Sequence, residues 1–166
     1  MRVLGIDPGS VTTGYGLVED RGSDLQAVAF GAITTQARTP FAQRLLRIYR
    51  ELRAVVTTHR PDCAAVESVF FAQNVQSALR LGQARGVALL ALAEEGLDIA
   101  EYAPREIKQA VTSYGHAGKA QVQEMVRILL HLPHLPQPAD AADALALAIC
   151  HHQAARLTAR LSRQHE

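Results

Sequence analysis

Four carboxylates stand at places where the neighbouring residues are apolar. Asp7 follows the apolar run 3–6, Glu67 follows the run 63–66, and Asp140 and Asp143 open an alanine-rich stretch. An ionised carboxylate among buried apolar residues is costly unless it is paired or bound to a metal. Together, these acids predict a divalent-cation site.

Each acid taken alone has a simpler explanation. Asp7 precedes a Pro-Gly turn, Glu67 could be a solvated residue at a strand end, and Asp140 could cap a helix. Asp143 is harder to explain structurally, because it falls inside an Ala/Leu helix whose other residues look buried. Only the joint occurrence of the four favours the metal site over these structural roles.

The elements expected along the chain can bring these acids together. Strands are expected at 3–6, 14–18, 27–33, 63–66 and 97–102, and helices from Thr39-Pro40 to 59, at about 74–95, from 104, at 119–130 and from about 139. The first three strands predict an antiparallel meander, and the whole order predicts an α/β domain with one mixed sheet. If the first and fourth strands are parallel neighbours, Asp7 and Glu67 emerge at the same sheet edge. Asp140 and Asp143, about 60° apart on one helix face, could pack over it.

Composition favours one soluble domain. The 166 residues are 48% hydrophobic and contain no low-complexity tract, which fits a single domain over 1–166 with a polar C-terminal tail from about 158. The first residues run into a strand without signal-peptide features, and no window approaches the roughly 18 apolar residues of a membrane span. We therefore expect a cytoplasmic protein with no membrane partner.

Arginine greatly outnumbers lysine among the basic residues. The net charge is +1, but setting the four carboxylates aside leaves seventeen basic residues against twelve acids, a modest field that attracts phosphate. Fifteen of the seventeen are arginine, and the only lysines are Lys108 and Lys119. Chance is one explanation, and the other is that a compact ammonium is needed there.

Cysteine and histidine offer less chemistry than the acids. Cys63 and Cys150 have apolar neighbours and no partner at ligand spacing, which predicts buried inert thiols. The adjacent pair His151 and His152 would point about 100° apart on a helix, so we do not expect these residues to share a metal.

Six motifs together resemble the RuvC family of Holliday-junction resolvases, the crossover junction endodeoxyribonucleases. They lie in order along nearly the whole chain, at 5–10, 13–16, 67–70, 81–86, 108–111 and 139–146. The last block and the Gly-Gln-Ala-Arg-Gly run are highly specific, whereas Gly-Ile-Asp-x-Gly alone would be weak. The resemblance implies a ribonuclease-H-like fold of the retroviral-integrase superfamily, with a central mixed five-stranded sheet flanked by helices.

The resemblance also implies roles for individual residues. Asp7, Glu67, Asp140 and Asp143 match the family's catalytic, metal-binding quartet, and Lys108 and Lys119 match its basic residues near the scissile phosphate. Phe70 matches an aromatic that stacks on bases at the junction. Further DNA contacts are expected from Phe71, Gln73, Asn74 and Arg105. Gln73 departs from relatives, which often have a basic residue there, so phosphate contact from this loop is expected to be weaker or supplied by an arginine elsewhere. For one of the two phenylalanines, a place in the core is the better expectation.

The implied reaction is hydrolysis assisted by two Mg²⁺ ions, about 3.5–4 Å apart in such sites, with Asp7 as the bridge and Mn²⁺ as a substitute. Paired symmetric nicks in strands of like polarity would give ligatable 5′-phosphate and 3′-hydroxyl ends, in homologous recombination and DNA repair. The implied partners are a four-way DNA junction, a second copy of the chain and a branch-migration complex of the RuvA–RuvB type.

The helix expected at 74–95 gives separate support for a homodimer. Its latter part is apolar or small nearly all round, with Ala78, Gly82 and Gly86 every fourth residue, which indicates that two faces are covered. The sheet could cover one face and a second subunit the other. A symmetric dimer would also place two sites on the two-fold symmetric junction.

Two other classes compete with this interpretation. Gly-Ile-Asp-x-Gly also occurs in sugar kinases and actin-like ATPases, but those need two related lobes and 166 residues leave room for one. A catalytically weak junction-binding module would keep the aromatics and lysines and lose carboxylates. All four carboxylates are present, which favours an enzyme.

Overall fold

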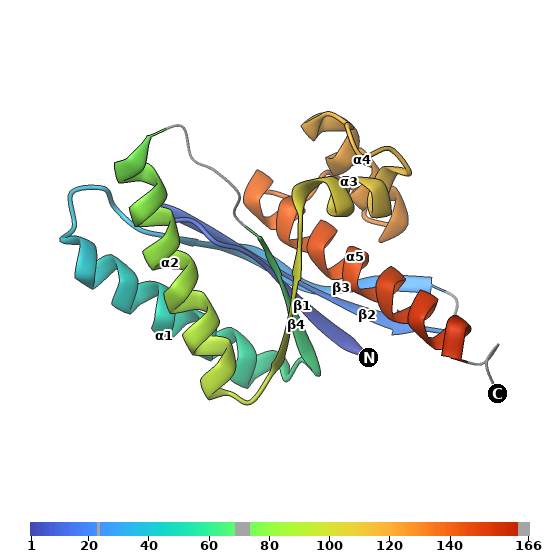
Figure 1. Ribbon diagram of the computed structural model, residues 1–166, viewed down its shortest axis with the longest axis horizontal. Helices are drawn as coiled ribbons and strands as arrows, with labels where there is room; N and C mark the ends of the chain where they lie inside the picture. Colours follow the sequence, from blue (N-terminus) through green and yellow to red (C-terminus); the bar gives the residue numbers. More distant parts are fainter. Residues whose placement is uncertain (23, 69–73, 163–166) are drawn as a thin grey trace.

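A five-stranded mixed sheet lies between two layers of helices in the computed structural model, which describes residues 1–22, 24–68 and 74–162 (Figure 1). The strands are β1 (Arg2–Asp7), β2 (Thr12–Arg21), β3 (Asp24–Thr34), β4 (Cys63–Glu67) and β5 (Asp98–Tyr102). The helices are α1 (Phe41–His59), α2 (Val75–Glu94), α3 (Pro104–Thr112), α4 (Lys119–Leu129) and α5 (Ala139–Ser162). The predicted α/β architecture is confirmed.

The strand order β3-β2-β1-β4-β5 places the two strands that end in acids side by side. β1, β2 and β3 form the predicted antiparallel meander, and β4 runs parallel to both β1 and β5. Ile6 pairs with Val66 in the β1–β4 ladder. The next residues, Asp7 and Glu67, therefore reach the carboxyl edge of the sheet together.

Both faces of the sheet are covered, which explains why β1 reads as a continuous apolar run. Val3 packs in the core shared with α3, α4 and α5, whereas Leu4 and Ile6 pack in the core shared with α1 and α2. α5 lies across the first of these faces (Figure 1). Residues 141, 142 and 144–150 of this helix are all buried.

Some element ends differ from the sequence expectations. α1 begins at Phe41 with Pro40 in the capping position and no side-chain cap, so Thr39 is not its N-cap. The polar segment expected from about residue 158 belongs to α5 as far as Ser162. Across the part of the chain that the structure describes, no helix has the length and apolarity needed to cross a membrane.

Candidate active site

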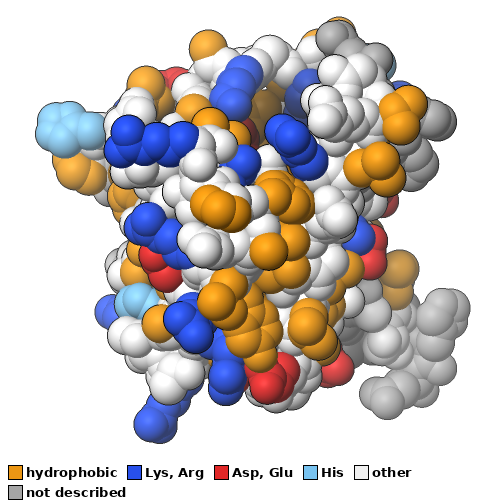
Figure 2. All heavy atoms as spheres, turned by 90° about the vertical axis from the view of Figure 1, so that its left-hand side faces the viewer, with side chains coloured by type: hydrophobic (Ala, Val, Ile, Leu, Met, Phe, Trp, Pro, Cys, Tyr) orange, Lys and Arg blue, Asp and Glu red, His pale blue; other side chains and the backbone are white. Residues whose placement is uncertain are grey.

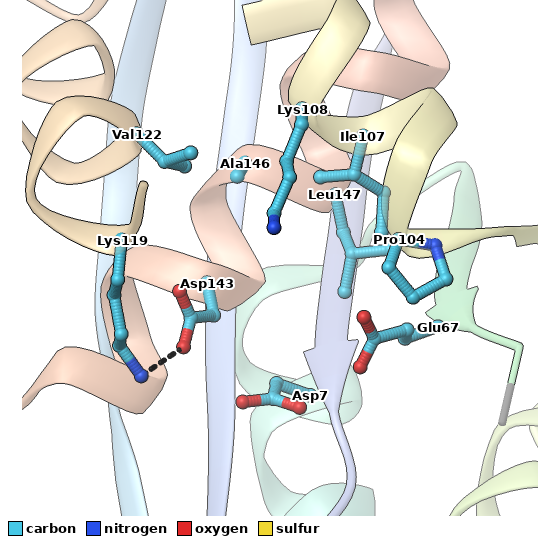
Figure 3. A pocket seen from close by; sticks show the side chains of 10 residues that line it. All are labelled: Asp7, Glu67, Pro104, Ile107, Lys108, Lys119, Val122, Asp143, Ala146 and Leu147. Carbon is cyan, nitrogen blue, oxygen red and sulfur yellow. Dashed lines mark ion pairs between the residues drawn. The ribbon is translucent and has the colours of Figure 1, made fainter. Parts of the chain in front are cut away.

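A cavity of about 290 Å³ opens at the carboxyl edge of the sheet, where β1 and β4 end (Figure 3). Asp7 and Glu67 enter it from the strands, and Asp143 enters from the second turn of α5. Lys108 from α3 and Lys119 from α4 complete the charged part of the lining. The apolar part consists of Pro104, Ile107, Val122, Ala146 and Leu147. Segments far apart in sequence thus bring three acids and both lysines of the chain to one place.

Close packing of α5 on the sheet brings its acids to this edge. A β-carbon on Gly5 would collide with the Ala144 carbonyl oxygen, and one on Gly14 would collide with the Asp140 carbonyl oxygen. Only glycine allows a helix backbone to approach strands this closely. Gly14 is also the residue of β2 that pairs with Asp7.

Asp140 lies beside the cavity and is not part of its lining. Its charge nevertheless acts on Asp7, because it is one of the carboxylates that raise the pKa of Asp7. The structure therefore gathers three of the four predicted acids in one cavity and keeps the fourth within electrostatic reach.

The carboxylates repel one another strongly. Burial is the largest cause that raises the pKa of Asp7 to about 7, and the charges of Glu67, Asp143 and Asp140 add to it. Burial also raises the pKa of Glu67, followed by the charge of Asp143. The Lys119 ammonium opposes both shifts without cancelling them. The site thus holds more negative charge than its own cations neutralise.

The two lysines take different positions in the cavity. Lys119 Nζ lies 2.8 Å from Asp143 Oδ2, and this contact is the largest cause that raises the pKa of Lys119. Lys108 extends from α3 toward the space between Asp143 and Glu67 (Figure 3). An ammonium is therefore available on each of two sides of the carboxylates.

The donor set fits a hard divalent cation, because it consists of carboxylate oxygens without histidine or cysteine. Within residues 1–22, 24–68 and 74–162, no three or more His, Cys, Asp and Glu side chains are grouped as they stand to hold a metal ion. The Lys119 ammonium lies against one oxygen of Asp143. The metal-binding roles of the four acids remain predictions.

Of the residues predicted to contact DNA, Asn74 and Arg105 are described by the structure, and neither lines this cavity. Phe70, Phe71 and Gln73 lie outside the described residues. The Asn74 side chain caps α2 by accepting a hydrogen bond from Ser77 N at 2.8 Å. Arg105 is exposed on α3, with its aliphatic stem next to Gly115.

Two polar residues that the sequence analysis did not single out brace the turn after Asp7. Thr13 is fully buried, and its Oγ1 donates to the Gly9 carbonyl oxygen at 2.8 Å. Arg44, only 5% exposed, donates from Nε to the Ser10 carbonyl oxygen and to Thr35 Oγ1, each at 3.1 Å. In the sequence, Thr13 stands out only as part of a motif, and nothing signals that Arg44 is buried.

Comparison with known proteins agrees with this geometry. The profile of the family described as Crossover junction endodeoxyribonuclease RuvC matches residues 3–151. The chain belongs to the RuvC family. The RuvC of Chloroflexus aurantiacus is 56% identical over 151 residues, which are 91% of this chain and 92% of the relative.

Solved RuvC structures share the fold. The Thermus thermophilus RuvC structure superposes with a TM-score of 0.86 at 37% identity, covering 95% of this chain and 97% of that one. The T. thermophilus RuvC in complex with a Holliday junction substrate superposes with a TM-score of 0.90 at 36% sequence identity, covering 95% of this chain and 96% of that one. The predicted family and the ribonuclease-H-like fold are therefore confirmed.

Proposed function

We propose that the chain is a structure-selective endonuclease that resolves four-way DNA junctions by metal-assisted hydrolysis. The observation that carries this proposal is the gathering of Asp7, Glu67 and Asp143, with Asp140 beside them, in one cavity with both lysines. Membership of the RuvC family, one member of which was solved with a Holliday junction substrate, supplies the substrate class.

The four carboxylates would hold two Mg²⁺ ions, for which Mn²⁺ could substitute. Burial and the neighbouring carboxylates together raise the pKa of Asp7 to about 7, and this supports the proposal because a bound cation would stabilise the ionised form. When bound, Mg²⁺ supplies Lewis-acid chemistry that activates water and neutralises charge on phosphate oxygens.

The lysines would act on the phosphate. Lys119, which reaches Asp143 at 2.8 Å, can also present its ammonium to a phosphate oxygen at the mouth of the cavity. Lys108 can do the same from α3. Both charges would stabilise the extra negative charge of the pentacovalent transition state. The products would be a 5′-phosphate and a 3′-hydroxyl, which a ligase can join.

Paired nicks require two sites, and the outer face of α2 is suited to a symmetric dimer contact. Val75, Leu79 and Leu90 are 78%, 63% and 60% exposed, and Gly82 and Gly86 leave open space between them. Figure 2 shows hydrophobic side chains running along the side of the molecule where α1 and α2 lie, with basic side chains next to them. Such a stripe permits close approach of an identical helix. As further parts of this proposal, the dimer works in the cytoplasm with a RuvA–RuvB-type branch-migration complex.

The dimer contact can be tested by sedimentation. Leu79→Asp introduces two charges into a symmetric interface and should convert the dimer to a monomer. Leu161→Asp changes another exposed leucine, on α5, and serves as the matched control. A monomeric wild-type protein, or a Leu79→Asp variant that remains dimeric, would argue against this contact.

The activity is tested with a synthetic mobile four-way junction, incubated with and without Mg²⁺ and followed by sizing and religation of the strands. We expect Mg²⁺-dependent paired cuts in strands of like polarity and products that a ligase reseals. Tight junction binding without cutting, at any Mg²⁺ or Mn²⁺ concentration, would instead identify a catalytically weak junction-binding module.

A further inference from the structure

The arginine of the Gly-Gln-Ala-Arg-Gly run has no part in the site described so far. Arg85 points inward from α2, and its side chain is 17% exposed. Its Nε donates to the main-chain carbonyl oxygen of Glu67 at 3.1 Å, and its Nη2 forms an ion pair with Glu101 on β5. One guanidinium thus joins α2 to the ends of two strands.

The Glu67 carbonyl needs this donor because β1 cannot supply one. In a parallel ladder, the main-chain nitrogens of alternate residues face the neighbouring strand. Because Ile6 pairs with Val66, the main-chain nitrogen of residue 8 faces the Glu67 carbonyl oxygen. Residue 8 is proline, which has no N–H. On the other side, β4 remains paired, since Ser68 N donates to the Tyr102 carbonyl oxygen at 2.9 Å. The Arg85 guanidinium replaces the missing ladder donor.

We propose that Arg85 is a positioning residue for metal binding, which holds the end of β4 so that the Glu67 carboxylate stays in the cavity beside Asp7. It acts through the main chain of Glu67 and touches neither metal nor DNA. This inference rests on the proposed function in one respect, namely that the carboxylates of the cavity hold a metal ion.

The brace acts at the point where β4 leaves the sheet. Glu67 is the last residue of β4, and its side chain enters the cavity beside Asp7 (Figure 3). The Arg85 guanidinium, which also pairs with Glu101 on β5, therefore holds the strand end that carries this carboxylate.

Direct Mn²⁺ binding to the metal-free full-length protein, measured by electron paramagnetic resonance, tests the proposal without relying on DNA cleavage. Arg85→Ala should weaken Mn²⁺ binding on the order of tenfold, as loss of an outer-shell partner does in other metal sites. Arg85→Lys should recover only part of this, because one ammonium cannot serve Glu67 and Glu101 as a fork does. Glu67→Gln should also weaken binding.

The double variant Arg85→Ala/Glu67→Gln decides whether Arg85 acts through Glu67. If it does, the double variant should bind Mn²⁺ as Glu67→Gln alone does. Arg53→Ala is the matched control, because Arg53 on α1 also ties α2 to a neighbouring element, with Nε 2.7 Å from Glu95 and 3.3 Å from Glu94 at the C-terminal end of α2, away from the cavity. It should leave Mn²⁺ affinity unchanged even where it lowers the melting temperature.

The proposal would be overturned if Arg85→Ala left the Mn²⁺ affinity unchanged, or if it lowered the affinity by the same factor in wild type and in Glu67→Gln. If Arg85→Ala does not fold, Arg85→Lys is compared with wild type in the same way, and an Mn²⁺ affinity equal to that of wild type would then contradict the proposal. A wild-type protein that binds Mn²⁺ but cuts no junction would refute the proposed function and leave this inference standing. Junction cutting by wild type together with unaltered binding by the Arg85 variants would refute the inference alone.

Discussion

Two polar clusters on the same helix behave in opposite ways. At the beginning of α5, Asp140 and Asp143 join Asp7 and Glu67, and burial together with these like charges raises the pKa of Asp7 to about 7. In the middle of α5, His151 Nδ1 lies 2.9 Å from the Tyr102 hydroxyl and His152 Nε2 lies 3.0 Å from the Val18 carbonyl oxygen. Burial lowers the pKa of both histidines, so they are held neutral.

The difference separates groups that support the fold from groups that serve chemistry. The histidines meet neutral partners, the Tyr102 hydroxyl and the Val18 carbonyl oxygen, although His152 Nδ1 is buried without a hydrogen-bond partner among the described residues. The carboxylates meet other carboxylates and are relieved only by a cation. Strain of this kind in a cavity is typical of functional sites. Substitutions among the carboxylates should therefore lower activity more than stability, and substitutions around the histidines should lower stability more than activity.

The largest effect is expected from Asp7→Asn. Cleavage of a four-way junction should fall by more than about 1,000-fold, because a proposed metal ligand is lost, while junction binding persists. The same change should raise the free energy of unfolding in chelator at pH 8 by about 1–3 kcal/mol, because a buried charge facing three carboxylates is removed. Gel-based cleavage and urea titration measure the two effects. Retained cleavage would refute the metal-site proposal.

The stability gain should depend on pH with a definite sign. Burial raises the folded-state pKa of Asp7 from its ordinary value of 3.8 to about 7, so between these values the folded state binds more protons than the unfolded state. Wild-type stability from this group therefore decreases as pH rises from about 4 to 7. The advantage of Asp7→Asn should be small at pH 5 and full at pH 8. A pH-independent advantage would mean that Asp7 is not the strained group.

Lys119→Gln should separate metal binding from catalysis. Removing the ammonium that lies 2.8 Å from Asp143 should tighten Mn²⁺ binding several-fold, because a competing cation is gone. Cleavage should nevertheless fall by about 100-fold, since the charge that stabilises the transition state is lost. Calorimetric titration and single-turnover cleavage measure the two quantities. Lys119→Arg is the companion variant, and full turnover there would show that charge alone suffices.

The gathering of Asp7, Glu67 and Asp143 could be predicted from sequence because each of them interrupts an apolar pattern. The order of the apolar runs also predicted that β1 and β4 are parallel neighbours, so that Asp7 and Glu67 leave the sheet side by side. The pairing of Ile6 with Val66 confirms this. Motif order predicted the family. The placement of Asp140 outside the cavity lining could not be predicted, since helical periodicity places it on the same face as Asp143.

The supporting residues were beyond sequence reasoning for a different reason. Arg44 and Arg85 lie on helices whose periodicity says nothing about which arginine reaches inward to a carbonyl oxygen. The need for Arg85 follows from the absence of an N–H on Pro8, which becomes visible only once the register of β1 and β4 is known. Partners that depend on register or on helix placement leave no trace in composition.

His152→Gln tests the neutral cluster. Burial lowers the folded-state pKa of His152 from its ordinary value of 6.5, so below pH 6.5 the unfolded state binds the proton more readily, and stability is lost as pH falls. This is opposite in sign to Asp7. Glutamine can still donate to the Val18 carbonyl oxygen without titrating, so the variant should lose less stability than wild type as pH falls from 6.5 to 5.5. Urea titrations at both pH values check this, and parallel curves for the two proteins would exclude His152 as the titrating group.

The smallest effect is expected from Tyr102→Phe, which removes one hydroxyl from the neutral cluster. The change deletes the 2.9 Å hydrogen bond to His151 Nδ1 and retains the edge-on contact of the two rings, whose centroids lie 5.9 Å apart. We expect the free energy of unfolding to fall by about 1 kcal/mol, with cleavage and Mn²⁺ affinity unchanged. Tyr102 also accepts the Ser68 N–H through its main-chain oxygen, next to Glu67, and this main-chain bond survives the substitution. A loss of cleavage in Tyr102→Phe at unchanged stability would therefore mean that the two clusters of α5 are coupled, and that the division between them is wrong.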